Sequence, residues 1–272
     1  MGLFIYFYMK SPIKYFGGKN GFANKILEHF PSNYQNLNYI EPFCGSAAML
    51  FHKETSPIEI INDLDSNITT LFQVLIDEEK FSKFRELLNL TPYSEELHYQ
   101  YFKELPTEKD PIQKAYKYFY INRTAYNGLG GFSITSHIRR GMPKSVSDYL
   151  SAIDNLPEIH NRLSKVIILN RDAIELIKKW DVANTFIYLD SPYANETRTG
   201  GRYKFDFTDE MQDKYLQTLL EVKNAKLLLS GYNCLRYQKL EEAGFNRYDM
   251  EIRTQNNNRV GKSKTESLWK NY

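Results

Sequence analysis

Short apolar runs alternate with amphipathic segments along much of this chain. The apolar runs lie at residues 39–43, 58–63, 165–169, 185–189 and 225–230, and the β-branched run at 58–63 is typical of a buried parallel strand. Apolar residues at helical spacing follow at 47–52, 172–180, 209–222 and 238–243. This alternation predicts a parallel α/β sheet. The final residues, 266–272, alternate like a strand, and we expect them to pair antiparallel with 245–253 at one edge of the sheet.

The stretch from residue 66 to residue 160 interrupts this alternation. It is mainly helical by its spacing of apolar residues, with segments at 67–76, 80–90, 112–120 and 146–163. A glycine-rich segment at 127–131 follows the third of these. We therefore predict an insertion over residues 66–160 within a domain formed by residues 12–65 and 161–272. Residues 255–264 are expected to form a flexible loop.

Composition places the chain among globular proteins without a membrane span. It has 272 residues, 42% of them apolar, and 35 Lys plus Arg oppose 33 Asp plus Glu, for a net charge of +2. No apolar run approaches the roughly 18 residues that a membrane span needs, and the short apolar opening at 2–9 lacks a signal-peptide cleavage site. Two distant cysteines, Cys44 and Cys234, predict neither a disulfide scaffold nor a zinc cluster. These features indicate a reducing cytoplasm.

The small net charge hides an uneven distribution. Residues 111–147 contain no Asp or Glu, yet they hold six cations: Lys114, Lys117, Arg123, Arg139, Arg140 and Lys144. Aromatic residues are interleaved with them, namely Tyr116, Tyr118, Phe119, Tyr120, Tyr126 and Phe132. Such a mixture suits a phosphate backbone and exposed bases, but it also fits a solvated helix face followed by a loop. The charge pattern alone leaves both interpretations open.

Candidate chemistry lies where the predicted strands end, the edge at which open α/β sheets bind ligands. Gly45 follows the first strand in a small-residue turn that would let a backbone pass close to a ligand. Asp63 follows the second strand, where it could bridge two ribose hydroxyls or cap the next helix. After the run at 185–189 come Asp190, Ser191, Pro192 and Tyr193, a carboxylate, a rigid turn and an aromatic platform.

Six motifs in one order are more specific than any of these signals. They are KYFGGK (14–19), EPFCGSAA (41–48), IINDLD (60–65), NRTAYNGL (122–129), YLDSPY (188–193) and ESLWKNY (266–272). Their order resembles the alpha group of the Dam-type (D12 class) DNA adenine-N6 methyltransferases, from about residue 12 to the end. The resemblance implies a Rossmann-like S-adenosylmethionine-dependent methyltransferase fold with an antiparallel terminal strand and a mainly helical target-recognition insertion.

The resemblance also assigns roles to individual residues. S-adenosylmethionine would be the cofactor, with no metal, and double-stranded DNA the partner. The implied cofactor residues are Tyr15, Lys19, Phe43, Gly45, Asp63, Asp172 and Asp190, and the implied catalytic residues are Asp190, Ser191, Pro192 and Tyr193. The implied DNA-binding residues are Arg123, Tyr126, Asn127, Arg139, Arg140 and Lys144. Among these, Tyr126 and Asn127 would fill the gap left by a flipped adenine, by analogy with the family.

Two positions depart from the family pattern. The usual catalytic motif is Asp-Pro-Pro-Tyr, whereas Ser191 holds the second position here. Since that position acts through its carbonyl, catalysis is expected to tolerate the change, and a weak or inactive DNA-binding homologue is the alternative. The Dam branch carries an arginine two residues after Asn-Gly-Leu, where this chain has Gly131. The resemblance therefore does not imply GATC as the target, and Arg139 or Arg140 would read guanine or bind phosphate.

Other functions compete with this hypothesis. An amino-methyltransferase acting on protein glutamine or RNA would use a similar catalytic turn, but the basic, acid-free insertion favours DNA. A nicotinamide oxidoreductase would need a glycine fingerprint that the turn at 45–48 lacks. We expect a monomer or weak dimer in the cytoplasm, bacterial or phage-encoded, associated with the nucleoid while acting, and a cognate restriction endonuclease that acts separately.

Overall fold

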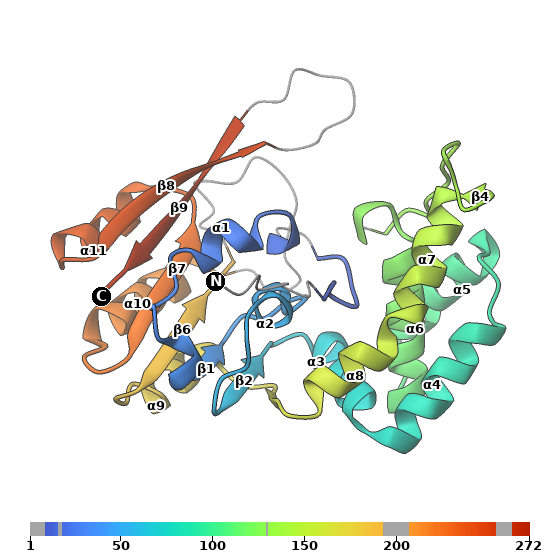
Figure 1. The fold of residues 1–272 in the computed structure, drawn as a ribbon, viewed down its shortest axis with the longest axis horizontal. Coiled ribbons are helices and arrows are strands. Elements are labelled where there is room, and N and C mark those ends of the chain that lie inside the picture. The colour runs from blue at the N-terminus through green and yellow to red at the C-terminus, as the bar shows by residue number, and fades with distance from the viewer. Residues whose placement is uncertain (1–8, 16–17, 129, 193–206, 254–262) are drawn as a thin grey trace, which may run out of the picture. The chain divides into compact units, whose positions relative to one another are not determined.

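The computed structural model describes residues 9–15, 18–128, 130–192, 207–253 and 263–272. These residues form two compact units (Figure 1). The sheet unit comprises Phe22–Cys44, Glu54–Leu64 and Leu169–Tyr272, and the helical unit comprises Met1–Gly21, Gly45–Lys53 and Asp65–Ile168. No helix in the described ranges is long and apolar enough to cross a membrane.

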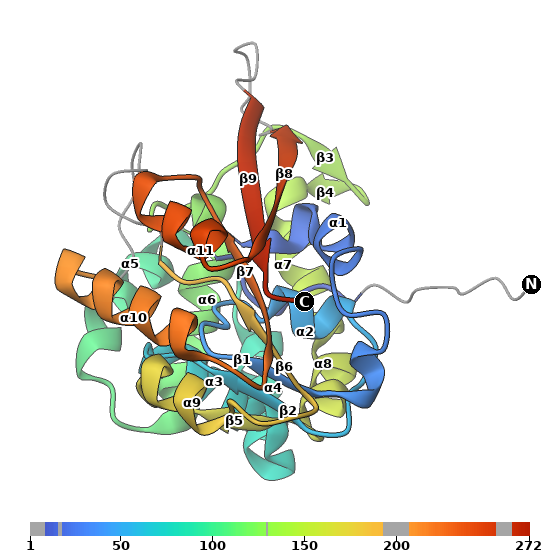
Figure 2. The ribbon, with the colours of Figure 1, turned by 90° about the vertical axis from the view of Figure 1, so that its left-hand side faces the viewer.

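A seven-stranded sheet in the order β5-β2-β1-β6-β7-β9-β8 confirms the predicted fold class. Its strands are β1 Asn38–Glu41, β2 Glu59–Asn62, β5 Ile167–Leu169, β6 Thr185–Leu189, β7 Lys226–Gly231, β8 Asn246–Arg253 and β9 Ser263–Lys270. β1 pairs in parallel with β2 and β6, and β6 pairs in parallel with β7. β9 runs antiparallel to both β7 and β8, and Figure 2 shows β8 and β9 as a tall pair of strands. The terminal antiparallel strand was thus predicted correctly.

Both faces of the sheet are covered, which is why its central strands are apolar at nearly every position. One face packs against α9 (Ala173–Lys179), α10 (Asp209–Glu221) and α11 (Gln238–Glu242). The other face receives Phe30, whose ring contacts Tyr39, Phe186 and Tyr188. Phe30 follows α1 (Ala23–Leu27), and the described part of the unit also contains the 3₁₀ turns Tyr34–Asn36 and Leu235–Tyr237.

Helices dominate the helical unit, and α6 is its central element. Its helices are α2 Ala48–His52, α3 Ser66–Ile76, α4 Glu78–Leu90, α5 Glu95–Glu104, α6 Pro111–Thr124, α7 Lys144–Asp154 and α8 Leu156–Leu163, with 3₁₀ turns at Lys19–Gly21, Leu105–Thr107 and Tyr126–Gly128. α6 packs against α3, α4, α5 and α7. A small hairpin joins β3 (Ile138–Arg139) to β4 (Met142–Pro143).

Two helix predictions in this unit need correction. The segment 146–163 was predicted as one helix, but it forms α7 and α8, because Pro157 cannot continue α7 and instead begins a new helix. α5 was not predicted. The hydroxyl of Ser94 caps it by accepting from Leu97 N at 3.4 Å, and Glu95 and Glu96 follow in its first turn.

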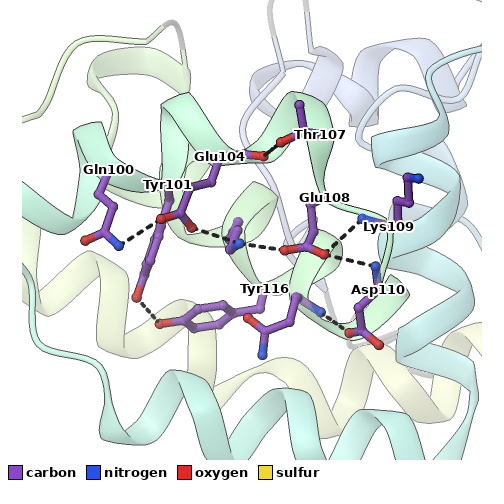
Figure 3. A network of polar contacts seen from close by, with 10 residues as sticks. Gln100, Tyr101, Glu104, Thr107, Glu108, Lys109, Asp110 and Tyr116 are labelled. Carbon is purple, nitrogen blue, oxygen red and sulfur yellow. Dashed lines mark hydrogen bonds and ion pairs between the residues drawn. The ribbon is translucent and has the colours of Figure 1, made fainter.

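Part of the basic stretch is internal structure rather than a surface for ligands. The Lys117 ammonium is buried and pairs with Glu104 at 2.8 Å and Glu108 at 2.6 Å. Figure 3 shows the surrounding network, in which the Tyr101 and Tyr116 hydroxyls lie 2.9 Å apart. Tyr116, Phe119 and Tyr120 are buried in the core. For these residues the structure favours an interior role over contact with bases or phosphates, and the acids that pair with Lys117 lie just outside the acid-free stretch.

Candidate active site

The strand order brings four predicted residues to one edge of the sheet unit. β5, β2, β1 and β6 are consecutive neighbours, and one predicted residue follows each of them. These residues are Asp172, Asp63, Phe43 and Asp190, respectively. We call this row of strand ends the carboxyl edge. It includes the switch point of the sheet, because β2 and β6 lie on opposite sides of β1, and open α/β sheets bind ligands at such a point.

Asn62, which the sequence analysis missed, joins three of these strand ends. Its side-chain NH₂ donates to Pro42 O at 2.9 Å and to Arg171 O at 3.0 Å, and its side-chain oxygen accepts from Arg171 N at 2.9 Å. Asn62 O also accepts from Cys44 N at 2.9 Å. The signal was available, since Asn62 is a polar residue inside a β-branched run. A buried amide at the end of a strand needs partners, and here they are the neighbouring turns.

Asp63 does not cap the following helix. That position belongs to Asp65, whose carboxylate accepts from Asn67 N at 2.9 Å at the start of α3. The backbone of Asp63 is tied to the β5 end, since its N donates to Leu169 O at 3.3 Å and its O accepts from Asn170 at 2.6 Å. The structure thus removes the capping alternative and places Asp63 on the carboxyl edge.

A buried thiol lies among the acids of this edge. Burial, and after it the charges of Asp63 and Glu41, raises the pKa of Cys44 well above its ordinary value. Cys44 is therefore a neutral thiol at physiological pH, and the negative charge of the edge belongs to its carboxylates. Glu41 itself accepts a hydrogen bond from the Tyr39 hydroxyl at 2.9 Å.

Asp172 has a structural role that the sequence analysis did not assign. It is the N-cap of α9, and its carboxylate accepts from Glu175 N at 3.0 Å. A cap of this kind stabilises a helix by about 1 kcal/mol. The capping bond accounts for Asp172 without a ligand, and its cofactor role stays a prediction.

The turn after β6 is held from behind by α10. Gln212 donates from its side-chain nitrogen to Pro192 O at 3.0 Å. Ser191 is buried and lies by Tyr215, whose pKa is raised well above its ordinary value by burial, then by the charges of Tyr237 and Asp190. Gln212 and Tyr215 were also missed by the sequence analysis. They lie on the inner face of an amphipathic helix, where residues three apart point the same way.

Aromatic rings surround this turn. Phe43, Phe207 and Tyr215 form a triangle of edge-to-face contacts, with ring centroids 5.6 to 5.7 Å apart. Phe43 is therefore fixed in position by packing. Tyr193, the predicted stacking residue, lies outside the described residues.

The helical unit holds three further predicted cofactor residues. The Tyr15 ring lies directly on Gly45, where a Cβ would come within 2.7 Å of the ring, and Gly45 has a φ of +48°. Only glycine meets both requirements without strain. Lys19 is 2% exposed in the 3₁₀ turn Lys19–Gly21. The structure thus brings Tyr15 and Gly45, which belong to two separate motifs, into contact.

The predicted DNA-binding residues also lie in the helical unit. The β3–β4 hairpin turns through Arg140 and Gly141, both with positive φ, which matches the right-handed twist of its strands. Arg139 pairs with Asp148 at 2.7 Å, Lys144 binds the same carboxylate, and Arg140 donates to the Ser151 hydroxyl at 3.2 Å. Asp148 is the residue that ends the acid-free stretch.

Tyr126 and Asn127 belong to a loop held by His98. The His98 ring contacts the Thr124 hydroxyl at 2.7 Å and Gly130 O at 2.8 Å, and Tyr126 N donates to Gly131 O at 2.7 Å. The Tyr126 side chain is 62% exposed, whereas that of Asn127 lies outside the described residues. An exposed aromatic on a loop fastened at both ends can contact a ligand without losing its position.

Comparison with known proteins decides the family. The family model for D12 class N6 adenine-specific DNA methyltransferases matches residues 15–255. The chain belongs to this family. It is 30% identical over 266 residues to the type II methyltransferase M.MjaIII of Methanocaldococcus jannaschii, covering 88% of this chain and 89% of that protein.

Two further relatives support the assignment. The type II methyltransferase M.CviBI of Paramecium bursaria Chlorella virus NC1A is 22% identical over 247 residues, covering 85% of this chain and 90% of that protein. The DNA adenine methylase of Escherichia coli is 23% identical over 184 residues, covering 67% of this chain and 64% of that protein. The resemblance stated from the sequence motifs is confirmed, and this D12 class protein is an adenine-specific DNA methyltransferase by family.

Proposed function

We propose that this D12 class protein transfers a methyl group from S-adenosylmethionine to the N6 amino group of an adenine flipped out of duplex DNA. The observation that carries the proposal is the carboxyl edge, where Asp63 and Asp190 follow the two buried strands that flank β1. Asn62, next to Asp63, hydrogen-bonds to the turn after β1, and Gln212 hydrogen-bonds to the turn that carries Asp190. A preorganised pair of acids at this edge suits a nucleoside cofactor and an amine substrate.

The residues present fit S-adenosylmethionine. Asp63 offers a carboxylate for the two ribose hydroxyls, and Gly45, which has no Cβ to clash with the Tyr15 ring, lets the backbone turn pass directly under that ring. Phe43, Lys19, Asp172 and Asp190 complete the proposed cofactor set. When bound, S-adenosylmethionine supplies an electrophilic methyl group on a sulfonium.

The chemistry of the amine assigns the remaining roles. The N6 lone pair of adenine is delocalised into the ring, so the amine is a poor nucleophile. Asp190 accepts one N6 hydrogen and the main-chain carbonyl of Ser191 accepts the other, which favours a pyramidal nitrogen with a localised lone pair. Tyr193 stacks on the base and orients it. Much of the acceleration then comes from positioning, and the base must leave the duplex to reach these groups.

Ser191 in place of proline is compatible with activity in this arrangement. The proposed role uses the backbone carbonyl, which every residue has. The bond from Gln212 to Pro192 O restrains the turn one residue later. This restraint favours an active enzyme over a DNA-binding homologue that has lost catalysis.

The proposal extends to partners. Arg123, Tyr126, Asn127, Arg139, Arg140 and Lys144 would contact DNA, and a cognate endonuclease would act as a separate protein. The enzyme would work as a monomer or weak dimer in the cytoplasm.

Labelled methyl transfer to mixed-sequence unmethylated DNA tests the proposal. Wild-type protein should form N6-methyladenine, and Asp190→Ala should lose transfer while still binding S-adenosylmethionine in calorimetry. Asp213→Ala is the matched control, because Asp213 is an exposed carboxylate on α10 that pairs with Arg236 at 2.5 Å. Turnover retained by Asp190→Ala, or the lack of N6-methyladenine with every DNA tried, would sink the proposal.

A further inference from the structure

A cavity of about 550 Å³ in the helical unit has an unusual charge balance. Its polar lining comes from the N-terminal segment, α2 and α6, and includes Lys10, Ser11, Lys14, Asn20, His52 and Arg123. No Asp or Glu is among the described residues that line it. A cavity with three cations and no carboxylate favours an anion.

Lys14 is held in this cavity by the end of α6. Asn122 fixes its backbone on both sides, accepting from Lys14 N at 2.8 Å and donating to Lys14 O at 2.7 Å. The ammonium donates to Ala125 O at 3.1 Å and Arg123 O at 3.3 Å. These carbonyls carry the negative end of the helix dipole, which explains part of the lysine's position but supplies no full negative charge.

Arg123 lies beside Lys14 with part of its donor capacity unused. One terminal nitrogen donates to Ser11 O at 3.1 Å, and the guanidinium carbon lies 5.9 Å from the centroid of the Phe119 ring. Its Nε is fully buried and has no hydrogen-bond partner among the described residues. A buried N–H of a cation without an acceptor is unfavourable, and since this atom has no surface facing the cavity, an oxyanion there would bind Arg123 through its other nitrogens.

The surroundings do not neutralise the pair. Burial and mutual repulsion lower the pKa of Lys14 to about 8, and burial lowers the pKa of Arg123 to about 10. Asp148 is the carboxylate whose charge opposes both shifts, but it is engaged by Arg139 and Lys144. The cavity and the hairpin therefore share one acid among several cations.

We propose that Lys14 and Arg123 form a binding site for a single phosphodiester of the DNA backbone. The proposal rests on DNA being the substrate and adds a defined phosphate contact outside the carboxyl edge. A guanidinium and an ammonium side by side match the spread charge of a phosphate. The electrostatic link through Asp148 to Arg139 and Lys144 favours the polyanion already assigned to these residues over an isolated small anion.

The salt dependence of DNA affinity tests this site. Arg123→Gln and Lys14→Gln each remove one charge, and Lys178→Gln removes the same charge from α9 in the sheet unit. Affinity for a short mixed-sequence duplex is measured over a series of salt concentrations, with circular dichroism to verify the fold of each variant. The two cavity variants should lower the slope of log affinity against log salt by about 0.9, the value for one lost phosphate, and the control should leave it unchanged.

A neutral backbone linkage gives a second test that needs no change in fold. Duplexes containing the sequence that the wild type methylates are made with one methylphosphonate at a time. At one position the neutral linkage should weaken wild-type binding several-fold and should have no further effect on Arg123→Gln.

Three outcomes would overturn the site. The first is a salt slope equal to that of wild type in both folded cavity variants. The second is that the neutral linkage and Arg123→Gln weaken DNA binding additively at every position. The third is that the cavity variants bind S-adenosylmethionine more weakly and DNA as tightly as wild type. Methyl transfer by wild type is measured on the same DNA, so a wild type that binds with the expected slope but forms no N6-methyladenine counts against the proposed function alone.

Discussion

Two regions were predicted to bind ligands, by different arguments. They are the carboxyl edge of the sheet unit and the basic stretch of the helical unit, and the prediction holds further for the first than for the second. At the carboxyl edge, strand order alone brings Asp63 and Asp190 to one border of the sheet. In the basic stretch, the prediction came from counting charges, and this count put buried and exposed residues into one group. Lys117 is neutralised in the interior, whereas Arg139 lies on an exposed hairpin. Backbone topology therefore locates a site more reliably than local charge, because a charge acquires its role from partners elsewhere in the chain.

The largest effect on stability is expected at the carboxyl edge, from Asn62→Leu. This change leaves Pro42 O and both backbone groups of Arg171 without their partner in a buried place, which should lower the free energy of unfolding by about 3 kcal/mol. Asn170→Leu, which removes one exposed bond to Asp63 O, is the control, at about 0.5 kcal/mol. Urea denaturation measures both, and equal losses would show that Asn62 does not hold the edge together.

In the helical unit, the comparison predicts that two lysines of α6 behave differently. Lys117→Met leaves Glu104 and Glu108 without their cation and should cost about 2 kcal/mol of unfolding free energy, with DNA affinity unchanged. Lys114→Met removes a bond to the exposed Ser66 hydroxyl and should cost little stability. Thermal unfolding and DNA titration separate the two effects. A DNA affinity lowered by Lys117→Met in folded protein would restore this lysine to the nucleic-acid surface.

The hairpin should affect DNA binding and leave the fold intact. Changing Arg139 and Arg140 together to Ala should weaken DNA binding and flatten its salt dependence, since two exposed cations are lost. The melting temperature should stay close to that of wild type. A salt slope equal to that of wild type would move the DNA surface away from the hairpin.

The smallest effect is a pH dependence that arises from Lys14. Its pKa of about 8 means that it is cationic at pH 7 and loses its proton as the pH rises through 8, so DNA affinity should fall a few-fold between pH 7 and pH 9. The charged or titratable groups near it are Lys10, Tyr15, His52, Arg123, Lys144 and Asp148. Lys14→Met measures how much of this pH dependence comes from Lys14. This variant should bind DNA more weakly than wild type at pH 7, and its DNA affinity should change less with pH. An equal pH response in both proteins would assign the titration to another group.

Much of the fold followed from short-range patterns in the sequence. The buried parallel strands were recognisable as short apolar runs, and the alternating pattern at the end of the chain predicted β9. Residues 144–163 form two helices because of Pro157. A proline is favourable in the first turn of a helix but breaks a helix when it lies in the interior. A single capping residue such as Ser94 was not enough to predict α5 from the sequence.

The site was predictable in its carboxylates but not in its supports. Asp190 stands at a strand end, which a pattern can locate. Asn62 and Gln212 act through backbone atoms of turns distant in the chain, and only the three-dimensional arrangement shows which turns these are. The same limit applied to Lys14 and Arg123, which are 109 positions apart and meet because Asn122 binds the backbone of Lys14.

Mapping of methylated bases in DNA from cells that express the chain tests the central claim most directly. With wild type, the account predicts N6-methyladenine at a recurring sequence in a host that otherwise lacks it. With Asp190→Ala, expressed at the same level, the mark should be missing. Unmethylated DNA in cells with folded wild-type protein, or the same mark with Asp190→Ala, would contradict the account.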